Sequence, residues 1–115
     1  MARRQTVSID FDGTICEHRF PEIGPIKPGA KEALTRLITT SKRWISSCRA
    51  SALFKRGPDN PYVDAMEKCL KDNEIPYTRI DRGDEGKVVA IAYVDDRGIR
   101  FEDNWPEIAE ALCSY

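Results

Sequence analysis

Acidic residues that follow two apolar segments are the strongest candidates for chemistry in this chain. Asp10 and Asp12 end the first apolar run, and Asp95 and Asp96 end another. Asp10 and Asp12 are two positions apart, so on an extended backbone both side chains leave the same face of a strand. Carboxylates gathered at one point repel one another, and a divalent cation relieves that repulsion. Because the donors are oxygens and the chain has one histidine, we expect the ion to be Mg²⁺.

A hydroxyl and an amine complete this set. Ser47 follows a short apolar run, and Lys87 precedes the apolar run that ends at Asp95. Carboxylates, Mg²⁺, a hydroxyl and a lysine together suit phosphoryl transfer, in which a protein mainly holds and neutralises a charged group. Ser46 and Ser51 are alternatives for the hydroxyl, because a one-residue shift in strand register exchanges the two faces.

Strands that alternate with helices must position these residues. The predicted strands cover residues 6–11, 43–47, 77–80 and 88–94, with a short edge strand over 98–101. The predicted helices begin at Pro28 and Pro61, and a last one covers 106–112. The segment 88–94 is apolar at nearly every position, which predicts a central strand covered on both faces. We therefore expect an α/β fold, a three-layer sandwich around a central and mostly parallel sheet. Its binding crevice lies beyond the carboxyl ends of the strands.

Length and composition limit the other possibilities. The chain has 115 residues, which fits one domain over 1–115 without a separate cap. Eighteen Lys and Arg against 19 Asp and Glu leave a formal charge of -1, so no general field attracts nucleic acid or an anionic membrane. The four cysteines lack C-x-x-C spacing and suit free thiols, and no apolar run approaches membrane-spanning length. We expect a cytoplasmic protein. Trp105 is expected either to pack on the core or to contact a partner.

The order of the candidate residues resembles a known family. Ile9-Asp10-Phe11-Asp12-Gly13-Thr14, then Ser47, then Lys87, then Val94-Asp95-Asp96-Arg97 is similar to the four motifs of the haloacid dehalogenase-like superfamily, over positions 10–96. The resemblance implies that Asp10 is the nucleophile and carries an aspartyl-phosphate, and that Asp12 is the general acid and base. It implies that Ser47 and Lys87 hold the phosphoryl oxygens. Asp95, with Asp10 and the main-chain carbonyl of Asp12, would bind Mg²⁺, and Asp96 is the second choice of ligand.

The resemblance also indicates the kind of reaction. An acid at position 12 favours phosphate esters over haloacids, so we expect a Mg²⁺-dependent phosphohydrolase that cleaves a phosphomonoester. The 37 residues from Asp10 to Ser47 and the 40 from Ser47 to Lys87 leave no room for a cap domain, as in the small capless members. A capless site is open, so either a large or polymeric substrate or a neighbouring subunit would cover it.

Three alternatives remain from the residues. The fold could serve as a non-catalytic phosphate-binding or signalling module. A nucleic-acid end phosphatase would also use an open site, although the near-neutral charge argues against it. A phosphoacceptor receiver domain has similar residues, but its lysine would come near the last strand, whereas Lys87 precedes the final acidic pair. Arg49 and Arg97 lie close to the acids in the sequence and could brace them or bind substrate.

Overall fold

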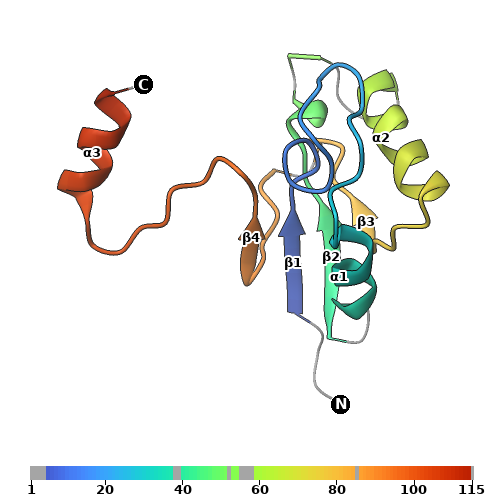
Figure 1. Cartoon of the computed structure of the whole chain (residues 1–115), viewed down its shortest axis with the longest axis horizontal. Helices are drawn as coiled ribbons and strands as arrows, with labels where there is room; N and C mark the ends of the chain where they lie inside the picture. The colour runs from blue at the N-terminus through green and yellow to red at the C-terminus, as the bar shows by residue number, and fades with distance from the viewer. Residues whose placement is uncertain (1–4, 38–39, 52, 55–58, 85, 115) are drawn as a thin grey trace.

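The computed structural model describes residues 5–37, 40–51, 53–54, 59–84 and 86–114. Its strands are β1 (Gln5–Ile9), β2 (Ser41–Ile45), β3 (Arg79–Ile80) and β4 (Ala92–Val94). They form one parallel sheet in the order β3-β2-β1-β4 (Figure 1). The helices are α1 (Ala30–Leu37), α2 (Pro61–Asp72) and α3 (Trp105–Cys113), with a 3₁₀ turn η1 (Cys48–Ala50). The predicted α/β fold with a central parallel sheet is confirmed, and the described residues form no cap domain.

Both α1 and α2 pack on the same face of the sheet. Val7, Ile9 and Ile45 point to this face, and they share one core cluster with Leu34 of α1 and with the α2 side chains Val63, Met66 and Leu70. The chain steps from β1 to β2 to β3 in one direction, and right-handed crossovers then place both helices on one side. The core on this face therefore fixes the carboxyl ends of β1 and β2, where the candidate site residues begin.

The other face of the sheet carries a different set of side chains. The strand register places six side chains in shared rows on this surface, which we call the second face. They are those of Thr6, Ser8, Lys42, Trp44, Arg79 and Tyr93. Arg79 stacks on the Trp44 ring, with the guanidinium carbon 4.6 Å from the ring centroid. Among the described helices, none contributes to a core on this side. The second face is therefore polar and aromatic rather than aliphatic.

The start of α2 agrees with the prediction from the sequence, whereas the start of α1 and the strand limits differ by a few residues. Pro61 opens α2 as predicted, and Asn60 caps it by accepting hydrogen bonds from the main-chain N–H groups of Tyr62 and Val63. The helix predicted from Pro28 begins at Ala30. Strand β1 ends at Ile9 and β2 at Ile45, two residues before each predicted end, because the chain leaves the sheet where the acidic and hydroxyl side chains begin.

The prediction for residues 88–94 is wrong in one respect. Only Ala92–Val94 form a strand, β4, and it lies at the edge of the sheet, where it pairs with β1 alone. All three of its residues are exposed. The cause is the absence of a strand beyond β4 among the described residues: 98–101, predicted as an edge strand, form neither a strand nor a helix. An all-apolar run therefore marked a sheet edge here, not its centre.

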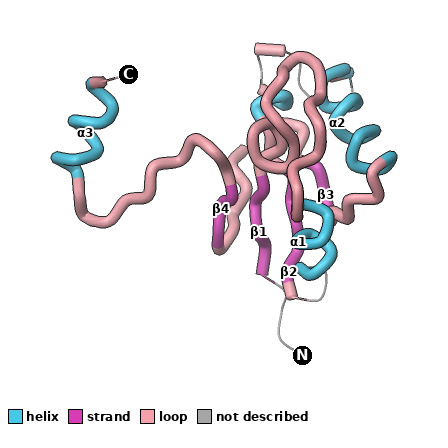
Figure 2. The backbone as a smooth tube through the Cα atoms, in the orientation of Figure 1, coloured by secondary structure: helices cyan, strands magenta, loops and turns pink. Residues whose placement is uncertain are grey.

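The last predicted helix is present, as α3, but it stands away from the sheet. Figures 1 and 2 show residues 95–104 running outward from β4 and α3 lying apart from the rest of the chain. Trp105 is 68% exposed, so it does not pack on the core. Within the described residues, no helix combines the length and the apolar character needed to cross a membrane.

Candidate active site

One cavity gathers all the residues singled out in the sequence. It has a volume of about 920 Å³ and opens at the carboxyl ends of the strands. The predicted site residues that line it are Asp10, Asp12, Ser47, Lys87, Asp95 and Asp96. They come from the loops after β1, β2 and β4 and from the segment that leads to β4. Binding crevices of parallel α/β sheets occupy this position.

Asp10 lies directly after β1, where its main-chain N–H still bonds to the Val94 carbonyl at 2.9 Å. Burial raises the pKa of its carboxyl to about 6, the neighbouring Asp96 carboxylate adds to the increase, and a hydrogen bond from the Phe11 N–H opposes it. Thr14 donates from its hydroxyl to Asp10 Oδ2 over 3.5 Å. Asp10 is thus a carboxylate held under like-charge repulsion at the base of the cavity.

Asp96, rather than Asp95, turns toward Asp10. Gly13 has φ +84°, and a Cβ built on it would come within 2.2 Å of Asp96 Oδ2. The tight turn therefore needs glycine both for its backbone and for the space that the Asp96 carboxylate fills. Asp95 instead accepts hydrogen bonds through Oδ1 from the main-chain N–H groups of Arg97 and Gly98. Of the two acids, Asp96, the second choice of metal ligand in the sequence-based prediction, is therefore the one that lies beside Asp10.

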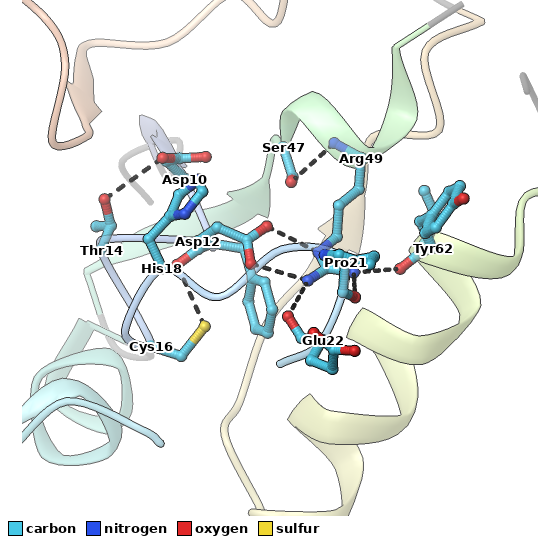
Figure 3. A network of polar contacts seen from close by, with 12 residues as sticks. Asp10, Asp12, Thr14, Cys16, His18, Pro21, Glu22, Ser47, Arg49 and Tyr62 are labelled. Atoms are coloured by element: carbon cyan, nitrogen blue, oxygen red, sulfur yellow. Dashed lines mark hydrogen bonds and ion pairs between the residues drawn. The ribbon is translucent and has the colours of Figure 1, made fainter. Parts of the chain in front are cut away.

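Asp12 is held by Arg49 in a two-pronged ion pair (Figure 3). Arg49 Nε donates to Asp12 Oδ2 over 2.7 Å, and Nη2 donates to Asp12 Oδ1 over 2.9 Å. The Arg49 side chain is 1% exposed and that of Asp12 is 11% exposed, so the pair is shielded from water. A planar guanidinium that meets both carboxylate oxygens fixes the direction of the acid. Arg49 therefore determines where Asp12 points.

Three main-chain carbonyls anchor Arg49 in turn. Its guanidinium donates to the carbonyls of Pro21 at 3.2 Å, Glu22 at 3.0 Å and Tyr62 at 3.5 Å. It also lies over the rings of Phe11 and Phe20. The sequence indicated Arg49 only as one of two arginines near the acids. Its position two residues after Ser47 was the available signal, and the loop carbonyls that hold it could not be foreseen.

The hydroxyl and the amine also face the cavity, each with a partner. Ser47 Oγ accepts the Arg49 main-chain N–H at 3.1 Å as the cap of η1, which leaves its O–H free to donate. Ser46, the alternative, lines the same cavity, and its Oγ has no hydrogen-bond partner within the described part of the chain. Lys87 is exposed, and its ammonium lies 4.9 Å from the centroid of the Tyr93 ring.

The carboxylates fit a magnesium ion as a partial site. Among the described residues, no three His, Cys, Asp or Glu side chains are grouped closely enough to hold a metal ion as they stand. Mg²⁺ needs fewer, because it keeps several waters and binds proteins through one or two carboxylates plus substrate phosphates. Asp10 and Asp96 supply that pair. Burial is the main cause of the raised pKa of Asp10, and a cation would relieve the repulsion by which Asp96 adds to it.

Comparisons with known proteins give a fold neighbour and no named family. No protein-family model matches the chain, and no curated protein matches it. A solved structure, described as that of a conserved protein from Bacteroides thetaiotaomicron, is 25% identical, with a TM-score of 0.67. The match covers 97% of this chain and 92% of that one. The similarity supports the fold across nearly the whole length, and the description of that structure names no activity.

Proposed function

We propose that the protein is a capless phosphohydrolase of the haloacid dehalogenase-like type, which cleaves a phosphomonoester with Mg²⁺ as cofactor. The observation that carries the proposal is the single cavity lined by Asp10, Asp12, Ser47, Lys87 and the acidic pair after β4. Each residue type needed for transfer through an aspartyl-phosphate is present at this one place. The described residues leave the cavity open, in keeping with a capless enzyme.

The side chains suggest the order of events. An Asp10 carboxylate oxygen attacks phosphorus, the bond from phosphorus to the leaving oxygen breaks, and Asp12 gives that oxygen a proton. Water then attacks the aspartyl-phosphate, Asp12 takes the proton, and the bond between Asp10 and phosphorus breaks to release inorganic phosphate. Ser47 and Lys87 would hold the non-bridging oxygens during both steps.

Arg49 acts in this scheme as a positioning residue. Both oxygens of Asp12 are engaged by Arg49, so Asp12 must release one of them to reach a leaving oxygen. Arg49 itself would stay in place, because main-chain carbonyls hold it independently of Asp12. The proposal therefore includes a rotation of the Asp12 side chain against a fixed guanidinium.

Mg²⁺, held by Asp10, Asp96 and the main-chain carbonyl of Asp12, would supply charge neutralisation that lets the anionic nucleophile meet an anionic substrate. We also propose that the protein works in the cytoplasm. All four cysteines are unpaired, which supports a reducing compartment.

The test is phosphate release from an aryl phosphate, measured with Mg²⁺ and then with a chelator. We expect release by the wild type with Mg²⁺ only, and a loss of at least about 10³-fold in Asp10→Asn, because the amide cannot act as the nucleophile. Asp72→Asn is the matched control, since Asp72 is an exposed aspartate on α2 outside the cavity. Near-normal turnover in Asp10→Asn would remove the assigned nucleophile. Mg²⁺ binding without turnover by the wild type would favour the non-catalytic phosphate-binding module.

A further inference from the structure

Three aromatic side chains gather at one side of the cavity. They are Phe20, Phe54 and Tyr62, which we call the aromatic cluster, and they come from the loop after β1, the segment after η1 and the first turn of α2. Each ring contacts the other two, with centroids 5.1 or 5.2 Å apart. Phe20 and Phe54 line the cavity, and Tyr62 packs against both of them. The cavity therefore has an aromatic side as well as an acidic one.

The rings of the cluster are held in place and are still accessible. Phe54 ends a turn in which its main-chain N–H donates to the Ser51 carbonyl at 3.0 Å. Phe54 is half-buried, although Leu53 beside it is 89% exposed, so the turn directs Phe54 toward the cluster. Phe20 and Tyr62 are half-buried as well. A half-buried ring that lines a cavity offers its uncovered surface to a ligand.

The cluster lies next to the groups that would act on a leaving group. Figure 3 shows the Arg49 guanidinium between Asp12 and Tyr62, with hydrogen bonds to the Asp12 carboxylate and to the Tyr62 carbonyl. The same guanidinium carbon lies 5.0 Å from the centroid of the Phe20 ring. In-line attack by Asp10 places the leaving oxygen on the far side of phosphorus, where Asp12 would protonate it. The group bonded to that oxygen would therefore begin beside the aromatic cluster.

The size of the cavity also calls for a leaving group of some size. Its volume of about 920 Å³ is near the upper end of the range of ~300 to 1,000 Å³ for small-molecule sites. A phosphoryl group is comparable to a few water molecules, each of about 30 Å³. The acidic side therefore uses a small part of the volume, and the rest is bordered by Phe20 and Phe54.

The hold of Arg49 on Asp12 favours one kind of leaving group. Both oxygens of Asp12 accept hydrogen bonds from Arg49, so giving up a proton requires Asp12 to break one of them. An oxygen that departs readily depends least on that proton. A phenol has a pKa of about 10, as in tyrosine, so an aryl oxygen leaves with less protonation than an alkyl oxygen. An aromatic alcohol suits this acid better than an aliphatic one.

We propose that the substrate is an aryl phosphomonoester and that the aromatic cluster binds its ring. The inference rests on the proposed phosphohydrolase function and names the substrate class of that site. The ring would pack on Phe20 and Phe54, as the rings of the cluster pack on one another. The bond between phosphorus and the aryl oxygen breaks, the oxygen keeps the bonding pair, and the proton from Asp12 gives the free phenol.

Calorimetric titration in the presence of Mg²⁺ tests the aromatic site without turnover. Benzylphosphonate has a ring where a phenyl ester has one, and ethylphosphonate lacks it. We expect the wild type to bind benzylphosphonate at least about tenfold more tightly, since burial of a ring and its contacts with two others account for that factor. Equal affinities would overturn the aromatic site and leave the phosphate site standing, and binding of neither would overturn both.

Substitution of Phe54 identifies the surface responsible. Phe54→Ala should bring the two affinities within about twofold of each other and leave the affinity for inorganic phosphate unchanged, which also shows that the variant is folded. Phe54→Leu keeps an apolar side chain in case the alanine variant does not fold, and it should lower the preference in the same direction. Phe101→Ala is the matched control, because Phe101 is an exposed phenylalanine outside the cavity. A full preference in the Phe54 variants would overturn the assignment.

Turnover separates this inference from the function on which it rests. In Phe54→Ala, kcat/KM for phenyl phosphate should fall about tenfold through KM, whereas kcat/KM for ethyl phosphate should not change. Equal losses for the two substrates would overturn the aromatic site while the phosphohydrolase stands. A wild type that prefers benzylphosphonate but hydrolyses neither ester would overturn the substrate class together with the enzyme, and the cluster would then be a ligand site only.

Discussion

Folding favours the protonated form of Asp10, whereas the proposed reaction needs its carboxylate. Its carboxyl has a pKa of about 6 in the folded protein against 3.8 ordinarily, mainly because burial disfavours the charge. The folded state therefore holds this proton more tightly than the unfolded state does, so the stability contribution is lost as the pH rises from about 4 through 6. At neutral pH the ionised carboxylate destabilises the metal-free protein.

Asp10→Asn should consequently stabilise the protein once metal is chelated. The raised pKa corresponds to about 3 kcal/mol in full, and solvent screening of this half-buried group reduces the expected gain to about 1 kcal/mol at pH 7.5. The gain should shrink as the pH falls through 6 and vanish below about pH 3, where the wild-type carboxyl is protonated in both states. Urea unfolding with a chelator at several pH values measures it. A difference between the two proteins that is the same at every pH would contradict this origin.

The acidic pair after β4 gives a second prediction at this scale. Because Asp96 faces Asp10 and Asp95 caps the turn, Asp96→Asn should raise the Mg²⁺ concentration for half-maximal effect about tenfold or more. Asp95→Asn should change it less and lower the melting temperature instead. Metal-induced thermal stabilisation reports this without requiring turnover. The reverse ranking would return the ligand role to Asp95.

Residue types and spacing predicted the acids but not the arginine that orients one of them. Side chains that follow parallel strands must gather at one edge, so Asp10, Ser47 and Asp95 could be brought together from the sequence. Arg49 depends on carbonyls of Pro21 and Glu22, which belong to a loop whose path no periodic pattern fixes. The choice between Asp95 and Asp96 likewise depends on a turn geometry that the sequence leaves open.

At the scale of elements, the start of α2 ties the helix to the site. Asn60 is fully buried; its Oδ1 accepts two N–H groups of the first helical turn, and its Nδ2 donates to the Arg49 carbonyl at 2.6 Å. Asn60→Ala should lower the free energy of unfolding by about 2 kcal/mol, since the cap and a buried carbonyl lose their partners together. Denaturant unfolding measures the loss.

Asn73→Ala provides the comparison for that experiment. Asn73 ends the same helix, and its exposed side chain donates to the Cys69 carbonyl at 2.8 Å, so its removal should cost well under 1 kcal/mol. Equal losses for the two variants would mean that burial of the cap is unimportant. Periodicity and the Pro61 signal predicted this helix closely, because its start, its apolar side and its end are all local properties.

β4 shows where such local reasoning stops. Its apolar residues predicted a strand but not its place in the sheet, since an apolar run suits either a buried centre or an edge that another surface covers. Whether a neighbour exists beyond β4 is decided by the path of residues 98–101. That path is a property of the whole chain.

At the scale of the whole molecule, the set of contacts that holds Arg49 has a consequence for the time course of folding. It joins Arg49 to residues 13 to 37 positions away in three separate segments. A buried guanidinium is costly until all of these partners are present, and it is the sheet and α2 that bring the three segments together. We therefore expect the sheet to assemble before Asp12 acquires its orientation. A newly made chain would look folded to spectroscopy some time before it could work, and gain of activity would time the last step.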